Sequence, residues 1–108
     1  MVASQNMGQN TIYTGEISGE QLKDFDVKWV IIGHSERRNV FNETNQVINA
    51  KVLKAQQLKL NTIICVGENA EEKELGQTNE VIKSQLDAIK DAVNDWNLVV
   101  IAYEPVWA

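Results

Sequence analysis

The chain has 108 residues, of which 44% are hydrophobic and 23% are charged, and this composition is typical of one soluble globular domain rather than a disordered segment. A formal net charge of −5 without any basic block argues against binding to nucleic acid or to an anionic membrane surface. No apolar run approaches the roughly 20 residues of a membrane-spanning helix, and segment 1–10 is too polar for a secretory signal.

Cys65 is the only cysteine and Pro105 the only proline, and both facts bear on how the chain is organised. An internal disulfide is impossible, and together with the missing secretory signal this predicts a cytoplasmic protein. No repeat, low-complexity tract or proline-rich linker divides the sequence. We therefore expect residues 1–108 to form a single domain.

The predicted elements begin with a weak strand from Val2 to Asn6, followed by a short helix that ends at Phe25. Ser18-Gly19-Glu20-Gln21 fits a capping box that would open this helix. Three short apolar runs come next, each continuous rather than alternating and rich in β-branched residues, at 29–33, 62–67 and 98–103. Runs of this kind predict strands that are buried on both faces, as in a parallel sheet.

Two amphipathic stretches separate these three strands. In 45–60 the apolar residues step by four and three, and Asn61 is expected to end the helix in the left-handed conformation. In 79–96, with Thr78 as the expected N-cap, the apolar positions step by four and three along one helix face: Ile82, Leu86, Ile89, Val93 and Trp96. Strands that alternate with such helices predict the α/β class, with parallel βαβ units. The periodicity leaves open whether the sheet is doubly wound or part of a barrel.

Three polar side chains, His34, Glu68 and Glu104, stand directly after predicted strands. Parallel α/β folds carry their functional groups at these strand ends. His34 and Glu104 follow strands that are separated by one other strand, so their backbones would lie roughly 10 Å apart. Pro105 would keep Glu104 extended. A carboxylate that faces an imidazole across this gap suits proton abstraction beside a carbonyl group.

A structural interpretation competes with this chemical one. A lone His at a strand end is more often structural or solvated, and a Glu before a Pro is a common loop residue. Glu68 is interpreted as a salt-bridge or hydrogen-bonding residue rather than a catalyst, and Cys65 as a packing residue between small apolar neighbours. The residue types alone therefore favour the structural interpretation. The exact sequences of the motifs distinguish between the two interpretations.

Four sequence blocks resemble those of the triosephosphate isomerase family, in the family's order and spacing. Residues 29–38, WVIIGHSERR, are similar to the family signature around the catalytic His. Residues 102–108, AYEPVWA, look like the signature around the catalytic Glu. Residues 13–18 and 64–68, YTGEIS and ICVGE, match two further blocks, so that the resemblance covers nearly the whole chain.

The resemblance implies a (β/α)8 TIM barrel, of which this chain would hold strands three to six, about half of the barrel. It implies an isomerase that interconverts dihydroxyacetone phosphate and glyceraldehyde 3-phosphate in glycolysis and acts as a homo-oligomer without a cofactor or metal. Carried over to this sequence, Glu104 would be the catalytic base and His34 the electrophile. Ser35 and Glu36 would be supporting residues beside His34.

Several parts of the family's site have no counterpart in this sequence. They are the Asn and Lys of the first strand, of which the Lys would pair with Glu36, the glycine-rich lid and the phosphate-binding loops after strands seven and eight. Segment 5–14 is also shorter than usual and lacks the expected Gly near Tyr13, in the loop that docks into a neighbouring subunit. We therefore expect weak or no turnover. The alternative is a non-catalytic scaffold that keeps the isomerase-like fold.

Half a barrel would leave the inner face of its sheet open. We expect Ile31, Ile64 and Val100, or their neighbours, to line this face. An exposed apolar face and two unpaired edge strands favour association. A two-fold dimer, in which the last strand of one chain pairs with the first strand of the other, would close the barrel.

Overall fold

The computed structural model describes residues 3–8 and 16–107 of the chain. Val2 of the first predicted strand lies outside these residues. So do Tyr13 and most of the shortened segment 5–14, and with them the prediction about the loop that docks into a neighbouring subunit.

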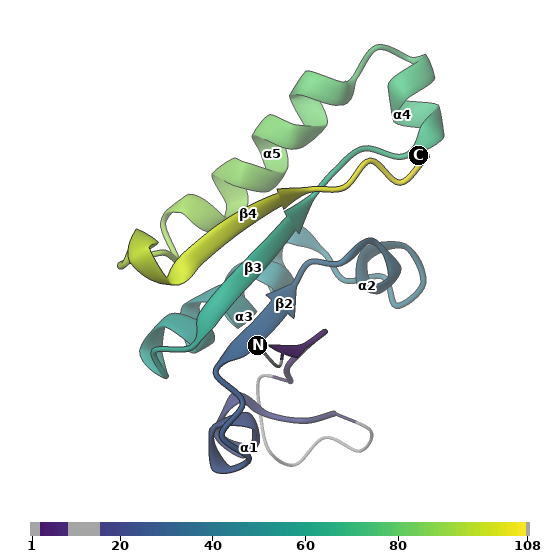
Figure 1. The fold of residues 1–108 in the computed structure, drawn as a ribbon. Coiled ribbons are helices and arrows are strands. Elements are labelled where there is room, and N and C mark those ends of the chain that lie inside the picture. The colour runs from purple at the N-terminus through teal and green to yellow at the C-terminus, as the bar shows by residue number, and fades with distance from the viewer. Residues whose placement is uncertain (1–2, 9–15, 108) are drawn as a thin grey trace.

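A four-stranded parallel sheet forms the centre of the molecule (Figure 1). Its strands lie side by side in chain order: β1 (Ala3–Ser4), β2 (Trp29–Ile32), β3 (Asn61–Val66) and β4 (Val99–Tyr103). A doubly wound sheet reverses its strand order at one point, whereas in a barrel each strand neighbours the next one along the chain. The unbroken order therefore indicates part of a barrel, and it confirms the predicted parallel βαβ units.

Helical segments connect the strands, and the two long ones pack against each other on one face of the sheet (Figure 1). They are α1 (Gly19–Asp24), α2 (Ser35–Asn39), α3 (Asn45–Gln57), α4 (Ala70–Glu74), α5 (Thr78–Lys90) and the 3-10 helix η1 (Trp96–Leu98). The predicted capping box of α1 is confirmed, because Ser18 Oγ accepts from the Gln21 N–H and Gln21 Oε1 accepts from the Ser18 N–H. Across the described segments, none of these helices has the length and apolar character that crossing a bilayer requires.

The predicted end of the last long helix is wrong. Helix α5 ends at Lys90, and Trp96 belongs to η1, where its side chain is 52% exposed. Beyond the end of α5, Oε1 of Gln56 in α3 accepts hydrogen bonds from the backbone N–H groups of Asn94 (3.0 Å) and Asp95 (2.8 Å). These bonds hold the chain on its non-helical path just before Trp96.

Two predicted cap residues are also displaced. Thr78 is the first residue of α5 and not its N-cap, because the helical hydrogen bonds already begin at the carbonyl of Gln77, which accepts from the Val81 N–H. After α3, the left-handed residue is Lys59, with φ of +57°. Asn61 is instead the first residue of β3.

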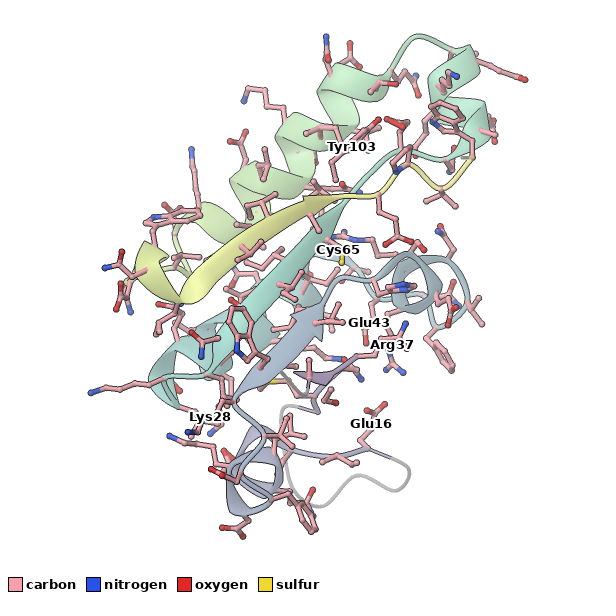
Figure 2. All side chains as sticks on the ribbon, in the orientation of Figure 1. Glu16, Lys28, Arg37, Glu43, Cys65 and Tyr103 are labelled. Carbon is pink, nitrogen blue, oxygen red and sulfur yellow. The ribbon has the colours of Figure 1, made fainter. Side chains whose placement is uncertain are left out.

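A buried ion network ties α2 to α3 and to the segment before α1 (Figure 2). The Glu43 carboxylate accepts from Arg37 of α2 (2.9 Å) and from Lys51 of α3 (2.5 Å), and its side chain is only 7% exposed. Arg37 also binds Glu16 at 3.0 Å, and Lys51 donates to Asn6 at 2.8 Å. A buried charge needs such partners, so the network fixes the loop after β2 against the helix layer.

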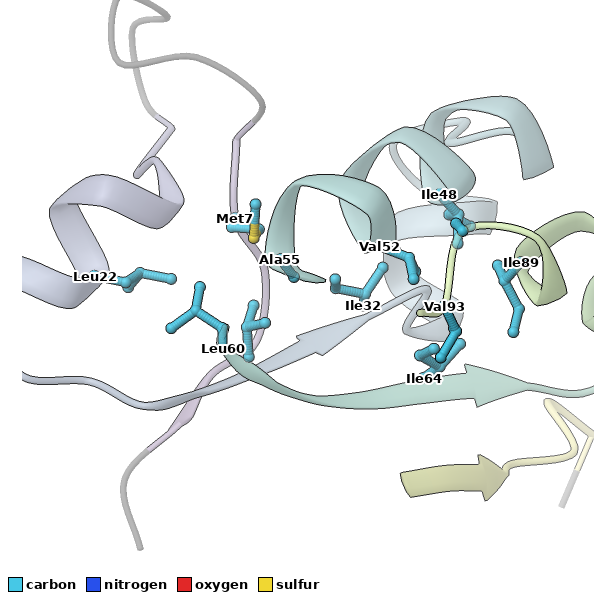
Figure 3. Close-up of a cluster of buried hydrophobic side chains, with 12 residues drawn as sticks. Met7, Leu22, Ile32, Ile48, Val52, Ala55, Leu60, Ile64, Ile89 and Val93 are labelled. Carbon is cyan, nitrogen blue, oxygen red and sulfur yellow. The ribbon is translucent and has the colours of Figure 1, made fainter. Parts of the chain in front are cut away.

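The hydrophobic core fills the layer between the sheet and the helices (Figure 3). Val30 and Ile32 of β2 and Ile64 of β3 point into this layer and are fully buried. From the helix side the layer is closed by residues of α3 and α5 and by the turn after α5: Ile48, Val52, Ala55, Ile89, Ala92 and Val93. Burying one such side chain contributes about 1.5–3 kcal/mol, so most of the stability arises on this face.

Within residues 3–8 and 16–107, no helix covers the opposite face of the sheet. The strand register aligns Ile31, Ile63 and Val100, and it places Ile32 beside Ile64. Since neighbouring positions of a strand point to opposite faces, Ile63 lies on the uncovered face. The prediction named Ile31, Ile64 and Val100 or their neighbours. Ile31 and Val100, the latter 49% exposed, lie on the uncovered face, whereas on β3 the neighbour Ile63 takes this place, because Ile64 is buried under the helices.

Candidate functional site

Three strands end close together at one edge of the sheet, and their following residues build the candidate site. Gly33 follows β2 with a φ of +79°, a left-handed value that favours glycine and turns the chain toward α2. Figure 2 shows Cys65 and Tyr103 at the same edge, near the ends of β3 and β4. A pocket of about 180 Å³ lies here, and Gly33, Ser35 and Glu104 are among the residues that line it.

His34 is the N-cap of α2, and this role fixes the proton on its ring. Its Nδ1 accepts a hydrogen bond from the backbone N–H of Glu36 at 3.2 Å. A nitrogen that accepts carries no proton, so the neutral imidazole bears its N–H on Nε2. This Nε2 lies 3.6 Å from Oε1 of Glu104. The imidazole therefore presents a donor to the space that it shares with the carboxylate.

Glu104 is held at the end of β4 through its backbone and its carboxylate. Its N–H donates to the carbonyl of Val66 at 2.8 Å, and Oε1 accepts from the hydroxyl of Ser35 at 3.2 Å. The side chain of Glu104 is 43% exposed and that of His34 is 22% exposed. Glu104 lines the pocket, and the partly exposed imidazole of His34 lies beside its carboxylate.

The structure brings three of the four predicted site residues together. Oε1 of Glu104 accepts from the Ser35 hydroxyl at 3.2 Å and lies 3.6 Å from Nε2 of His34. Glu36 contributes only its backbone N–H, and its exposed carboxylate has no partner among residues 3–8 and 16–107.

Glu68 is a hydrogen-bonding residue, as predicted. It is fully buried, and its carboxylate accepts from the hydroxyl of Tyr103 at 2.5 Å and from Nε1 of Trp107 at 2.9 Å. The Tyr103 hydroxyl is the main cause that lowers the pKa of Glu68 and keeps it ionised. The backbone carbonyl of Glu68 accepts from the Val106 N–H at 2.9 Å. Glu68 thus fastens the segment on both sides of Glu104 to the end of β3.

Cys65 is a packing residue, also as predicted. Its side chain is 5% exposed, and burial raises the pKa of its thiol above the ordinary value. A thiol with a raised pKa is a poor nucleophile. Within the described part of the chain, no group of three or more His, Cys, Asp or Glu side chains is arranged to hold a metal ion.

Two side chains that the sequence analysis missed bind the backbone beneath the site. Arg38 donates to the carbonyls of Gly33 (2.9 Å) and Cys65 (3.1 Å), and so it fixes the ends of β2 and β3 relative to each other. Gln85 of α5 binds both backbone groups of Gly67. For Gln85 a signal was present, because this amide interrupts the apolar stripe of its helix. For Arg38 the sequence carries none, because Arg37 and Arg38 look alike.

The fold and this edge define a class of protein: a barrel-type parallel α/β chain with a carboxylate and an imidazole facing each other at the strand ends. A family model described as triosephosphate isomerase matches residues 1–108. The chain is 50% identical over 109 residues to triosephosphate isomerase, chloroplastic, of Arabidopsis thaliana, an alignment that covers 99% of this chain. The chain belongs to the triosephosphate isomerase family, and its fold is part of that family's TIM barrel. It spans 35% of the length of the Arabidopsis relative.

Proposed function

We propose that this chain carries the proton-transfer centre of a triosephosphate isomerase, which interconverts dihydroxyacetone phosphate and glyceraldehyde 3-phosphate. The observation that supports this most directly is the approach of His34 Nε2 to Glu104 Oε1 at 3.6 Å in a chain of this family. A glutamate base beside a neutral imidazole is the arrangement described for triosephosphate isomerase itself.

In this proposal Glu104 is the base. Its carboxylate takes a proton from the hydroxyl-bearing carbon next to the substrate carbonyl. The electron pair of that C–H bond forms a C=C bond, and the π pair of the carbonyl moves onto its oxygen. The Nε2–H of His34 donates to this oxygen and stabilises its developing charge. The proton of the neighbouring hydroxyl then passes to this oxygen, and Glu104 returns its own proton to the former carbonyl carbon. The neighbouring carbon becomes the new carbonyl, so the reaction needs no oxidant, reductant or cofactor.

Ser35 and Glu36 take the supporting roles. The Ser35 hydroxyl holds the carboxylate of Glu104 in place between turnovers. The backbone N–H of Glu36 keeps the proton of His34 on Nε2, where the substrate oxygen would lie. These roles are proposals, and they rest on the contacts described above.

We further propose that turnover is weak. The substrate carries a phosphate dianion, and the only cationic side chain along the described part of the pocket is that of Arg38. Its guanidinium already donates to Gly33, Cys65 and Asn45. Glu104 is 43% exposed, and water around a site weakens the electrostatic stabilisation of the transition state.

The decisive experiment measures isomerisation of glyceraldehyde 3-phosphate by the chain and by Glu104→Gln at matched concentrations. Replacing the base by an amide of equal size removes proton abstraction without changing the packing, so the variant should lose at least about 100-fold of the rate. His34→Gln should lose rate as well. Equal rates in the parent and in Glu104→Gln would refute the proposed centre.

The uncovered sheet face supports a second candidate, a scaffold that self-associates or binds a partner. Val100 is 49% exposed and lies beside Ile31 and Ile63 on a face that the described helices leave open. Apolar surfaces of this kind mark association sites. We propose a homo-oligomer, and sedimentation of the chain over a range of concentrations tests it: a monomer at every concentration would refute it.

We also propose a cytoplasmic location, supported by the single unpaired cysteine and its burial. The Arabidopsis relative is named as chloroplastic, so the test must include a marker protein for plastids. Fractionation of cells that make this chain would test the proposal, and recovery with plastids or with secreted proteins would refute it.

A further inference from the structure

Gln85 is a buried polar residue on an otherwise apolar stripe. It lies between Ile82 and Ile89 on the core-facing side of α5, and it is 9% exposed. Burying a primary amide costs free energy unless its donor and acceptor are both satisfied. Here both are satisfied by one residue: Oε1 accepts from the N–H of Gly67 at 2.8 Å, and Nε2 donates to the carbonyl of Gly67 at 3.2 Å.

The Gln85 amide makes the hydrogen bonds to Gly67 that strand β2 is too short to make. The N–H of Glu104 donates to the carbonyl of Val66, on the side of β4. Alternate residues of a parallel strand bond to opposite neighbours, so the backbone groups of Gly67 face the other side, toward β2. Strand β2 ends opposite Ile64 and does not reach this level. Without Gln85, the N–H and carbonyl of Gly67 would have no protein partner among the described residues.

Gly67 in turn is in direct contact with the backbone of Glu104. A Cβ atom at position 67 would collide with the backbone carbonyl of Glu104 and would lie 3.2 Å from the nitrogen of Pro105. Nothing separates the two backbones, and a shift of one therefore displaces the other. The peptide that Gln85 holds is thus in direct contact with the residue that carries the carboxylate.

We propose that Gln85 is a positioning residue for Glu104 and acts on it through the backbone of Gly67. By holding this peptide, Gln85 fixes where β4 ends, and so it sets the reach of the Glu104 carboxylate toward Ser35 and His34, which lie 3.2 and 3.6 Å away. Its importance for turnover rests on the proposed role of Glu104 as the base, whereas its effect on the backbone does not.

The chain offers a matched control in Gln56. This residue is also a buried glutamine, 7% exposed, whose amide binds backbone groups: it accepts from Asn94 and Asp95 and donates to the carbonyl of Asp95. These contacts lie at the opposite end of the sheet, where β4 begins. Gln56→Met and Gln85→Met therefore remove the same kind of bonds at opposite ends of the strands.

The test measures amide hydrogen exchange by NMR in the 108-residue chain, with the amide of Ile64 as the internal reference. In Gln85→Met the amide of Glu104 should exchange about tenfold faster relative to the reference, because its local opening becomes easier. In Gln56→Met this ratio should stay as in the parent. The same ratio at Glu104 in both glutamine variants would overturn the proposal, since Gln85 would then act only on overall stability.

Activity provides the second arm. If the parent turns over, Gln85→Met should lower kcat about tenfold with little change in KM, because a displaced base affects the transition state more than binding. Gln56→Met should keep the parent's kcat, and an unchanged kcat in Gln85→Met would overturn the proposal. If the parent and Glu104→Gln are equally inactive, the proposed function fails, and the exchange comparison still decides on Gln85.

A second variant covers the case in which Gln85→Met does not fold. Gln85→Glu keeps the size of the side chain and the acceptor for the Gly67 N–H but loses the donor to the Gly67 carbonyl. The exchange ratio at Glu104 should then rise above the parent's value. A ratio equal to the parent's would overturn the proposal.

Discussion

The two faces of the sheet carry similar side chains in very different surroundings. On the face under α3 and α5, Ile32 and Ile64 have no exposed surface, and on the other face Val100 is 49% exposed. Yet Ile63 and Ile64 are neighbours in the chain, and both are isoleucine. The difference shows that stability comes from what the helices cover. The uncovered face and the strand ends are the parts for which we propose association and substrate binding.

The largest expected effect comes from the buried ion network around Glu43. Lys51→Met removes one of the two cations that hold Glu43, whose second carboxylate oxygen already has no hydrogen bond in the described structure. Breaking a buried pair in this way costs about 3–5 kcal/mol of unfolding free energy. Denaturant unfolding should show this loss. Lys54→Met on the same helix breaks only a partly exposed pair with Glu20 and should cost less than about 1 kcal/mol. Equal losses would contradict the role of burial.

The adjacent isoleucines provide the most direct comparison of the two faces. Ile64→Ala should lower the unfolding free energy by about 2–5 kcal/mol, because it leaves a cavity in a packed layer. Ile63→Ala, on the uncovered face, should cost about 1 kcal/mol. Thermal or urea unfolding of both variants measures the difference. If Ile63→Ala costs as much as Ile64→Ala, the second face is covered in solution, and a second copy of the chain in the proposed homo-oligomer would be the first candidate for covering it.

The strand-end cluster should give a pH dependence. The Tyr103 hydroxyl lowers the pKa of Glu68 in the folded chain, so the unfolded chain binds more protons in this range. The resulting stability is present above the unfolded carboxyl pKa of about 4.3, and it is lost as pH falls through the lower folded pKa. Tyr103→Phe removes the hydrogen bond, so the melting temperature of the variant should fall less steeply with pH below about 4. Parallel curves for parent and variant would contradict this account.

The smallest expected effect is on the uncovered face. Val100→Ser should change the unfolding free energy of the monomer by less than about 0.5 kcal/mol, because the side chain is half exposed already. It should nevertheless weaken association, which analytical ultracentrifugation measures. Val99→Ser serves as the control, because Val99 packs against the core on the covered side. A large loss of monomer stability in Val100→Ser would contradict the assignment of the two faces.

Much of the fold was predictable because local patterns and tertiary packing agree. The continuous apolar runs became parallel strands, and the capping box at Ser18 formed with both of its hydrogen bonds. The errors arose where a distant side chain intervened. Trp96 lies outside α5, and Gln56, far away in the sequence, binds the backbone N–H groups of Asn94 and Asp95 just before it. No periodicity within α5 reveals that contact.

The candidate site was predictable as to residue type and place, but not as to its supports. The motif wording selected His34 and Glu104, and the order of the strands brings them together. The face of Ile64 could not be chosen from its sequence, because a continuous apolar run has no alternation that marks one side. Arg38 and Gln85 act on backbone carbonyls and amides, which every residue carries, so the sequence contains no partner motif for them.

The contacts of Trp107 give this edge of the molecule an optical reporter. Its indole N–H donates to Glu68, the ammonium group of Lys73 lies 3.2 Å from the centre of its ring, and the side chain is 43% exposed. With Trp29 and Trp96 replaced by phenylalanine, Trp107 would be the only tryptophan left in the chain. Any movement of the segment after Glu104 would change the polar surroundings of this fluorophore. Its emission would therefore record, in real time, whether that segment moves when a triose phosphate is added.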